Sequence, residues 1–169
     1  VGNIMNTLLL CGAFLPEIEN IVRTLSKKEA ANQIFWEGKI GKWNVLATTT
    51  GVGLITTAQQ LARFLQEHRV GQILFTGTAG TTDINHFPIG TIIRGKNVIL
   101  GDLSALQNNS YFPSIMLQKI GLKHFLNINQ SNAVDVFSPL AITKTSDGVL
   151  LLQKNYGVVA ENLETFSVA

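Results

Sequence analysis

The chain has 169 residues, of which 46% are hydrophobic and only 14% are charged. This is enough apolar material for one sizeable core, and we expect a single domain over residues 1–169. Thirteen Lys and Arg against eleven Asp and Glu leave a formal charge of +2, and the basic residues are scattered along the chain. Binders of nucleic acid or anionic membranes gather their basic residues, so we expect neither as a partner.

Cysteine and histidine usage argues against disulfides and metals. Cys11 is the single cysteine and lies in an apolar run, which predicts a buried, unreactive thiol. His68, His86 and His124 are far apart and lack ligand-spaced companions, so no metal site is expected. The sequence shows no secretory signal and no apolar run of about twenty residues, which predicts a cytoplasmic protein without a membrane span.

In the first half of the chain, β-rich runs alternate with helix-period segments, the pattern of an α/β fold with a largely parallel sheet. Residues 7–11 are continuously apolar and predict a buried strand, and Pro16 suits the first turn of a helix that runs to about Leu25. The segments 34–37 and 43–49 predict the two strands of a hairpin.

The pattern continues beyond the hairpin. Four apolar residues at helical spacing predict a helix that ends near His68: Ile55, Ala58, Ala62 and Leu65. Residues 72–75 predict another buried strand, and the run 91–100 predicts a longer one. Further elements are a short helix over 114–120, strands over 141–144 and 158–161, and the start of a helix over 163–169. Asp147 lies in a stretch with the composition of a turn.

Ligands of α/β sheets normally bind at the carboxyl ends of the strands, and three loops follow predicted strands: Gly12–Glu17, Gly51–Gly53 and Gly77–Gly80. The second loop is similar to a dinucleotide fingerprint, but Thr56 stands where helix packing requires Gly or Ala, which favours a tight turn with positive φ. The third offers backbone N–H groups and the Thr78 hydroxyl to a sugar hydroxyl or an anion.

A fourth segment, Glu161–Glu164, places carboxylates at a predicted strand-to-helix junction. Carboxylates at the ligand edge of a sheet are costly unless they are hydrogen-bonded, and vicinal ribose hydroxyls are suitable donors. Taken alone, Glu164 has a simpler interpretation as a solvated residue at a helix start, where it interacts with the helix dipole.

Taken in order, these segments resemble the nucleoside phosphorylase and nucleosidase superfamily. The segments that carry the likeness are Gly12–Glu17, Thr50–Gly53, Phe75–Gly80, Phe87–Thr91 and Ala160–Glu164. The resemblance implies an α/β three-layer sandwich with a mostly parallel mixed central sheet, and a homodimer. It also implies that residues 1–169 lack the C-terminal strand and helix of the family, with the residue that protonates the purine.

The same resemblance implies the roles of individual residues. Glu17 falls where nucleosidases keep the catalytic carboxylate that positions or deprotonates the attacking water, and Glu164 where they hold the ribose hydroxyls. The other expected substrate-binding residues are Gly51, Thr78, Ala79, Gly80, Asn162 and Leu163. A carboxylate beneath an oxocarbenium-like ribosyl cation suits this chemistry and supplies roughly 3 kcal/mol of barrier lowering. No cofactor or metal is required.

Bacterial phosphorylases of this family bind phosphate with arginines near these loops, and none is present here. Position 54 is Leu54, and Phe75 stands before Gly77 where such an arginine would be. The resemblance therefore implies that water, and not phosphate, is the nucleophile. Leu100–Ser104 and Tyr111–Pro113 resemble futalosine hydrolases, enzymes of a menaquinone route that release hypoxanthine, and futalosine is the preferred substrate. Tyr111 and Phe112 equally fit ordinary core packing. The alternatives are a methylthioadenosine/S-adenosylhomocysteine nucleosidase, a purine nucleoside phosphorylase and a non-catalytic nucleoside-binding module.

Overall fold

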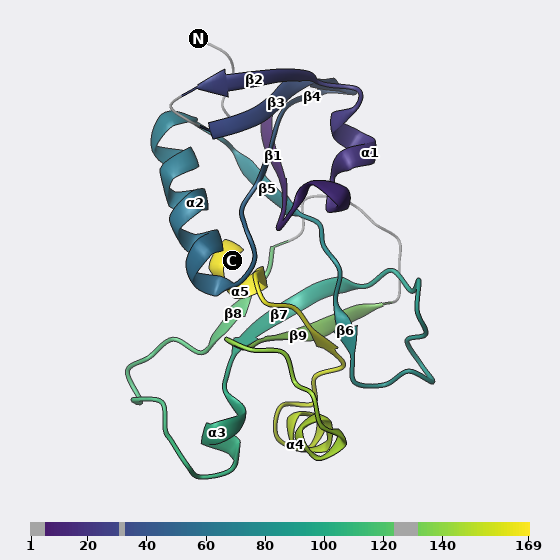
Figure 1. Ribbon diagram of the computed structural model, residues 1–169, viewed down its shortest axis with the longest axis vertical. Coiled ribbons are helices and arrows are strands. Elements are labelled where there is room, and N and C mark those ends of the chain that lie inside the picture. Colours follow the sequence, from purple (N-terminus) through teal and green to yellow (C-terminus); the bar gives the residue numbers. More distant parts are fainter. Residues whose placement is uncertain (1–5, 31–32, 124–131) are drawn as a thin grey trace. The chain divides into compact units, whose positions relative to one another are not determined.

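The computed structural model describes residues 6–30, 33–123 and 132–169 (Figure 1). Contacts divide the chain into two compact units: unit 1 runs to Thr78 and includes Val168, and unit 2 comprises Ala79–Ser167 with Ala169. In the described part of the chain, each unit contains one five-stranded mixed sheet. The predicted α/β class is confirmed. The strands form two mixed sheets, one in each unit, and the expected single domain over residues 1–169 stays a prediction.

The sheet of unit 1 is parallel at its centre and antiparallel at one side. Its strands, in spatial order, are β2 (Ser26–Ala30), β3 (Gln33–Ile40), β4 (Trp43–Thr49), β1 (Thr7–Gly12) and β5 (Gln72–Phe75). β1 pairs in parallel with both β4 and β5, whereas β3 pairs antiparallel with β4 and β2. The carboxyl ends of β1, β4 and β5 therefore lie at the same edge of this sheet.

Apolar side chains cover both faces of this sheet, which explains the continuous apolar run of β1. On one face, α2 (Leu54–Glu67) contributes Leu61 and Phe64 to a core with Cys11 and Phe35. On the other face lie η2 (Leu15–Glu17) and α1 (Glu19–Val22), as Figure 1 shows. The predicted helix from Pro16 to Leu25 is wrong in its length, because the backbone at Ile18 (φ −121°, ψ −4°) separates these two short elements.

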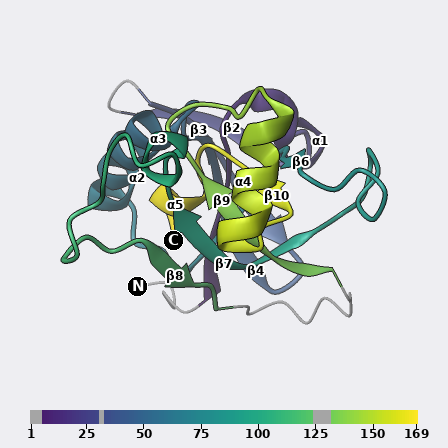
Figure 2. The ribbon, with the colours of Figure 1, turned by 90° about the horizontal axis from the view of Figure 1, so that it is seen from below.

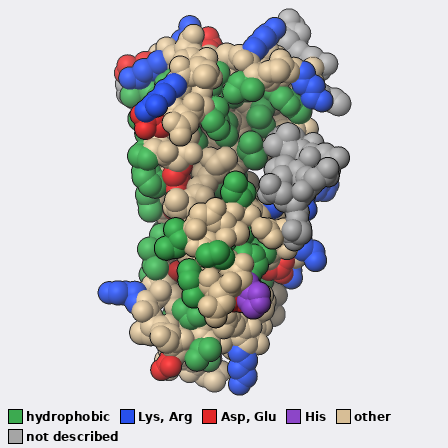
Figure 3. Space-filling model, turned by 90° about the vertical axis from the view of Figure 1, so that its right-hand side faces the viewer, with side chains coloured by type: hydrophobic (Ala, Val, Ile, Leu, Met, Phe, Trp, Pro, Cys, Tyr) green, Lys and Arg blue, Asp and Glu red, His purple; other side chains and the backbone are tan. Residues whose placement is uncertain are grey.

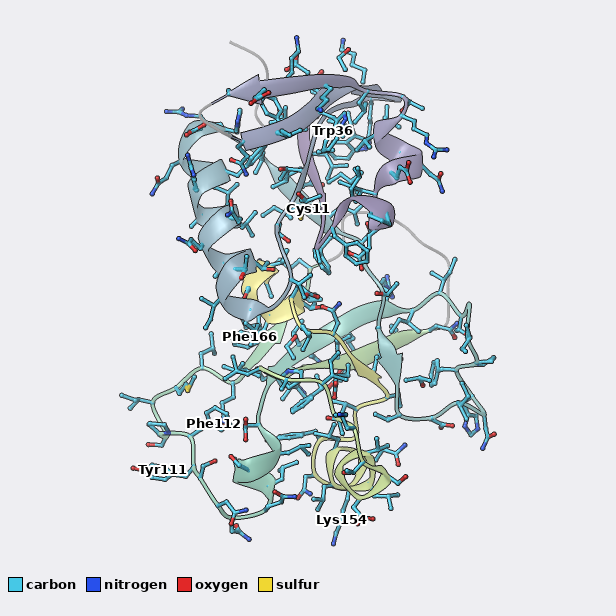
Figure 4. The ribbon with its side chains drawn as sticks, viewed as in Figure 1. Cys11, Trp36, Tyr111, Phe112, Lys154 and Phe166 are labelled. Atoms are coloured by element: carbon cyan, nitrogen blue, oxygen red, sulfur yellow. The ribbon has the colours of Figure 1, made fainter. Side chains whose placement is uncertain are left out.

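Cys11 is fully buried in this core, as predicted, and Figure 4 labels it on β1. Burial removes solvation from the thiolate and raises the pKa of the thiol to about 12. We therefore expect no reaction with a thiol reagent at pH 8 until the protein is unfolded, which a comparison of labelling rates with and without urea measures. Because the folded-state pKa is raised, stability from the neutral thiol is complete below the unfolded-state pKa and is lost as pH rises toward 12.

The sheet of unit 2 also has a parallel centre, but it is antiparallel at both edges. Its order is β6 (Gly80–Thr81), β10 (Ala160–Glu161), β9 (Ala133–Ser138), β7 (Arg94–Leu100) and β8 (Lys119–Gly121). β9 pairs in parallel with β7 and β10, and the edge strands β6 and β8 run antiparallel to their neighbours. The carboxyl ends of β9 and β10 thus form a second candidate ligand edge.

The described residues of the second half form three helices: α3 (Leu103–Leu106), α4 (Ser146–Tyr156) and α5 (Thr165–Val168). Figure 2 shows α4 with the strands of the unit 2 sheet. Leu152 of α4 packs with Phe137 of β9 and Ile99 of β7 in the core of this unit. The ring of Tyr156 stacks on Phe137 with a centroid distance of 5.5 Å. Burial and the charge of Asp102 raise the pKa of the Tyr156 hydroxyl.

Several predictions for the second half are wrong. The segment 114–120 contains no helix and ends in β8, and 141–144 is a loop, while the strand of this region is Ala133–Ser138. Asp147 belongs to the first turn of α4 and not to an isolated turn. Thr145 caps that helix, because its Oγ1 accepts the Gly148 N–H at 3.1 Å.

Tyr111 and Phe112, for which core packing was one interpretation, differ in exposure. Tyr111 is 84% exposed and lies on the loop after α3 (Figure 4), so core packing is wrong for this residue. Phe112, beside it, is partly buried.

Lys and Arg side chains are spread over the face in Figure 3 and do not form one stripe. Within the described ranges, no helix is both long and apolar enough to span a bilayer. His124 lies outside the described residues, and elsewhere in the described chain no three His, Cys, Asp or Glu side chains are grouped to hold a metal ion.

Candidate active site

The loops after β1 and β4 are tied together by backbone hydrogen bonds at the carboxyl edge of the unit 1 sheet. The Thr50 N–H donates to the Gly12 carbonyl at 2.9 Å, and the Gly51 N–H donates to the Ala13 carbonyl at 2.9 Å. The buried Thr50 hydroxyl adds a bond to the Gly12 carbonyl at 3.3 Å. These bonds fix the loop that carries Glu17.

The Glu17 carboxylate joins the loop after β1 to the loop after β5. Its Oε2 accepts the Ala13 N–H at 2.7 Å, and its Oε1 accepts both the N–H and the hydroxyl of Thr78, at 2.9 and 3.1 Å. Because an ionised carboxylate has about four acceptor positions, these three donors leave room for one more, such as a water molecule. The side chain is therefore held by both loops.

Local sequence explains this close approach of the two loops. A Cβ on Gly12 would lie 3.0 Å from the Thr76 carbonyl oxygen and 3.1 Å from the Glu17 Cβ, so a larger residue would push the loops apart. Pro16 sits at the start of η2, which brings the Glu17 side chain back toward Ala13. A short 3-10 turn in place of a regular helix thus positions the carboxylate.

Gly51 has φ +79°, which confirms the predicted tight turn. A Cβ there would lie 2.4 Å from the Thr56 Cγ2, so the start of α2 is packed directly on this glycine. The Thr57 hydroxyl donates to the Gly51 carbonyl at 3.0 Å and further fixes the turn. The turn supports the Glu17 loop through the bond from Gly51 to Ala13.

Charge is sparse in these loops. The segments Gly12–Glu17, Thr50–Leu54 and Phe75–Thr78 contain Glu17 and no other charged residue. Leu54 is buried as the first residue of α2, and the Phe75 ring lies 3.2 Å from the position of a Cβ on Gly77. An anionic co-substrate would therefore meet a carboxylate and no cation from these segments.

The remaining predicted site residues belong to unit 2. Gly80 is exposed in β6 and pairs with Glu161 of β10, so the end of the third loop meets the fourth motif. Ala79 is also exposed and Leu163 is partly buried. Glu164 is only 4% exposed, so the interpretation as a solvated residue at a helix start is wrong.

Asn162 shapes the turn that carries Glu164. Its Oδ1 accepts the backbone N–H groups of Glu164 at 3.0 Å and Thr165 at 2.9 Å. The Ser138 hydroxyl donates to the Asn162 carbonyl at 2.7 Å, which fastens the turn to the end of β9. Asn162 therefore has a structural role here, and its contact with substrate stays a prediction.

The structure brings Glu17, Gly51 and Thr78 together in unit 1, and it places Gly80 next to the Glu164 motif in unit 2. A common site for Glu17 and Glu164 stays a prediction. Sequence reasoning missed the donor role of the Ala13 N–H and the environment of Glu161, which is 9% exposed. The four-residue spacing of Ala13 and Glu17 across Pro16 was the available signal for the first.

The chain belongs to the phosphorylase superfamily, whose family model matches residues 7–132. No curated protein sequence matches the chain.

Solved structures share the fold at low sequence identity. Futalosine hydrolase of Helicobacter pylori is 17% identical with a TM-score of 0.81, over 97% of this chain and 77% of that chain. The 5′-methylthioadenosine/S-adenosylhomocysteine nucleosidase of the same organism is 17% identical with a TM-score of 0.80, over 99% and 78%. The corresponding nucleosidase of Neisseria meningitidis is 18% identical with a TM-score of 0.77, over 97% and 78%.

Proposed function

We propose that the protein hydrolyses the N-glycosidic bond of a purine nucleoside, with Glu17 as the base that positions and deprotonates the attacking water. The observation that carries this proposal is the Glu17 carboxylate, held by Ala13 and Thr78 at the carboxyl edge of a parallel sheet. Solved structures of the same fold include nucleosidases for two different purine nucleosides.

In the proposed reaction, the water oxygen bonds to the anomeric carbon while the bond from that carbon to the purine nitrogen breaks. The water proton passes to Glu17, and the bonding electrons leave with the purine, which is released after protonation. The negative charge of Glu17 stabilises the ribosyl cation in the transition state, and its hydrogen bonds keep it oriented without reorganisation. The hydrogen bonds from Ala13 and Thr78 are the contacts that orient Glu17 for this role.

Water is preferred to phosphate as the nucleophile because of the charge in the loops. A phosphorylase must hold a phosphate dianion beside the sugar, which requires cationic or N–H donors. The loops around Glu17 contain no Lys or Arg, and a second anion next to its carboxylate would be repelled. This supports hydrolysis over phosphorolysis.

The segment of Glu164 is proposed to hold the ribose hydroxyls, with Ala79, Gly80 and Leu163 as neighbours of the sugar. Support comes from the burial of Glu164 and from the pairing of Gly80 in β6 with Glu161 in β10. On the basis of the family resemblance, we also propose that the protein is a homodimer and lies in the cytoplasm.

Futalosine is the preferred substrate, and methylthioadenosine or S-adenosylhomocysteine is the second candidate. The preference comes from the likeness of Leu100–Ser104 and Tyr111–Pro113 to futalosine hydrolases. The second candidate is favoured by the similar TM-scores of the methylthioadenosine nucleosidases. Asp102 in the first of these segments accepts the Ser104 N–H at 2.7 Å and so caps α3, which is a structural task in either case.

We expect the protein to release hypoxanthine from futalosine at a rate that is independent of added phosphate. The test incubates the protein with futalosine, methylthioadenosine and inosine, each with and without phosphate, and identifies the free base by chromatography. Release of adenine from methylthioadenosine alone would select the second candidate. Base release that requires phosphate would contradict hydrolysis, and binding of a nucleoside without release would indicate a non-catalytic module.

A further inference from the structure

Glu161 is a buried carboxylate with one dominant partner. Its Oε1 accepts the Thr143 N–H at 2.9 Å and its Oε2 accepts the Thr143 hydroxyl at 2.6 Å. The N–H and the hydroxyl of Thr143 are neutral donors, so this contact is not a salt bridge. A buried charge is costly unless hydrogen bonds compensate it. The two hydrogen bonds to Glu161 therefore stabilise a single position of Thr143.

The hydrogen bonds between Thr143 and Glu161 join segments that are far apart in the sequence. Glu161 ends β10, and its backbone pairs with Gly80 of β6 on one side and with Phe137 of β9 on the other. Thr143 lies in the loop 139–145, which leaves the carboxyl end of β9. One residue thus connects the third glycine loop, the loop after β9 and the motif that contains Glu164.

The loop 139–145 is held at a second point beside the first. Thr145 caps α4 through Gly148, and a Cβ on Gly148 would lie 2.9 Å from the Thr143 Cγ2. Thr143 is therefore packed against the first turn of α4 on one side and hydrogen-bonded to Glu161 on the other. Between the end of β9 and Thr143, the loop exposes Leu140 and Ile142, each 66% exposed, at the ligand edge of the sheet.

We propose that Glu161 is a positioning residue that holds the loop 139–145 in its substrate-binding position beside the Glu164 motif. The inference rests on the proposed function, because it assigns this edge of unit 2 to the nucleoside. Glu161 touches no reacting atom in this role. It fixes Thr143, and through it the exposed apolar side chains of Leu140 and Ile142 that an apolar part of the substrate would contact.

Thr143→Val tests the role, because it removes the hydroxyl at nearly constant volume. We expect KM for the preferred nucleoside to rise about tenfold with kcat within about twofold, since the loop contact is lost equally in ground and transition states. Thr143→Ser keeps the hydroxyl and should restore KM to within about threefold. Glu161→Gln should match Thr143→Val, and the double variant should add little to either single change.

Thr82→Val is the matched control, since the Thr82 hydroxyl donates to the Val158 carbonyl at 2.9 Å near the start of β10. It should leave KM unchanged. An equal rise in KM for Thr82→Val, or no rise for Thr143→Val, would overturn the proposal, as would a fall in kcat at constant KM. Failure of Thr143→Ser to restore KM would do the same.

Amide hydrogen exchange separates this inference from the proposed function. In the wild type the Thr143 N–H should be protected, and Glu161→Gln should speed its exchange at least tenfold, with or without substrate. If the wild type releases no base from any nucleoside, the proposed function fails and the substrate role of the loop fails with it. Unchanged exchange in Glu161→Gln, in an enzyme that does turn over, would contradict the positioning role alone.

Discussion

Glu17→Gln should lower kcat/KM for base release by about 100- to 10,000-fold, the range typical of a lost general base. The substitution removes the negative charge and replaces one carboxylate oxygen by an NH2 group. That group faces an N–H donor whichever way the amide is turned, because Ala13 donates to one oxygen and Thr78 to the other. The variant therefore loses both the base and part of its orientation.

Glu19→Gln provides the matched control for this experiment. Glu19 lies two residues further along, and it forms an exposed ion pair with Arg23 at 2.8 Å. Removing such a pair costs little, so turnover should be unchanged. Both variants should fold, with the melting temperature of Glu19→Gln near that of the wild type and that of Glu17→Gln lowered by the lost hydrogen bond. Wild-type turnover in Glu17→Gln would exclude the proposed role of this carboxylate.

Gly51→Ala should destabilise unit 1 by about 3 kcal/mol, through a positive φ that disfavours a side chain and through a clash with Thr56. The change should also lower kcat/KM, because movement of Gly51 displaces Ala13 and with it the N–H that holds Glu17. Urea unfolding followed by tryptophan fluorescence measures the stability. Trp36 and Trp43 both lie in the unit 1 sheet, so the signal reports on this unit.

Two further variants distinguish the cost of a side chain at positive φ from the cost of the clash with Thr56. Gly41→Ala changes a hairpin residue with φ +56° and nothing within 4 Å of the added Cβ, so it should cost only about 1 kcal/mol. Adding Thr56→Ala to Gly51→Ala removes the clashing Cγ2 and should recover most of the difference. Equal destabilisation by Gly51→Ala and Gly41→Ala would show that the contact with Thr56 is unimportant.

The elements that could be predicted from the sequence are those with a strong apolar pattern. β1 and α2 have apolar residues at the spacing of a buried strand and of an amphipathic helix, and the hairpin of β3 and β4 has a glycine at its turn. β2 was missed because all five of its side chains are exposed and give no apolar signal. Only its pairing with β3 defines it as a strand.

Helix α4 shows why a local pattern can mislead. Its first residues have the composition of a turn, yet the side chain of Thr145 and the small Gly148 make them a helix cap. The segment just before was predicted as a strand from its β-branched residues, but Thr143 is held by Glu161 from a distant strand. Tertiary contacts of this kind leave no local signal.

The candidate site was predictable to the extent that strand ends determine it. The loops of Glu17 and Thr78 follow parallel strands that flank one another, so their approach follows from the topology of the sheet. The hydrogen bonds that hold the Glu17 carboxylate could not be predicted, because they depend on the short turn at Pro16 that replaces the expected helix.

The outer strand β2 limits how copies of this protein can associate. Its five exposed residues, Ser26–Ala30, include Lys27 and Lys28, and Lys28 pairs with Glu37 of the neighbouring strand at 3.2 Å. β2 is the edge strand of the sheet, and its exposed charged side chains disfavour pairing with the edge strand of a second copy. Any assembly of this protein is therefore expected to leave this strand in water.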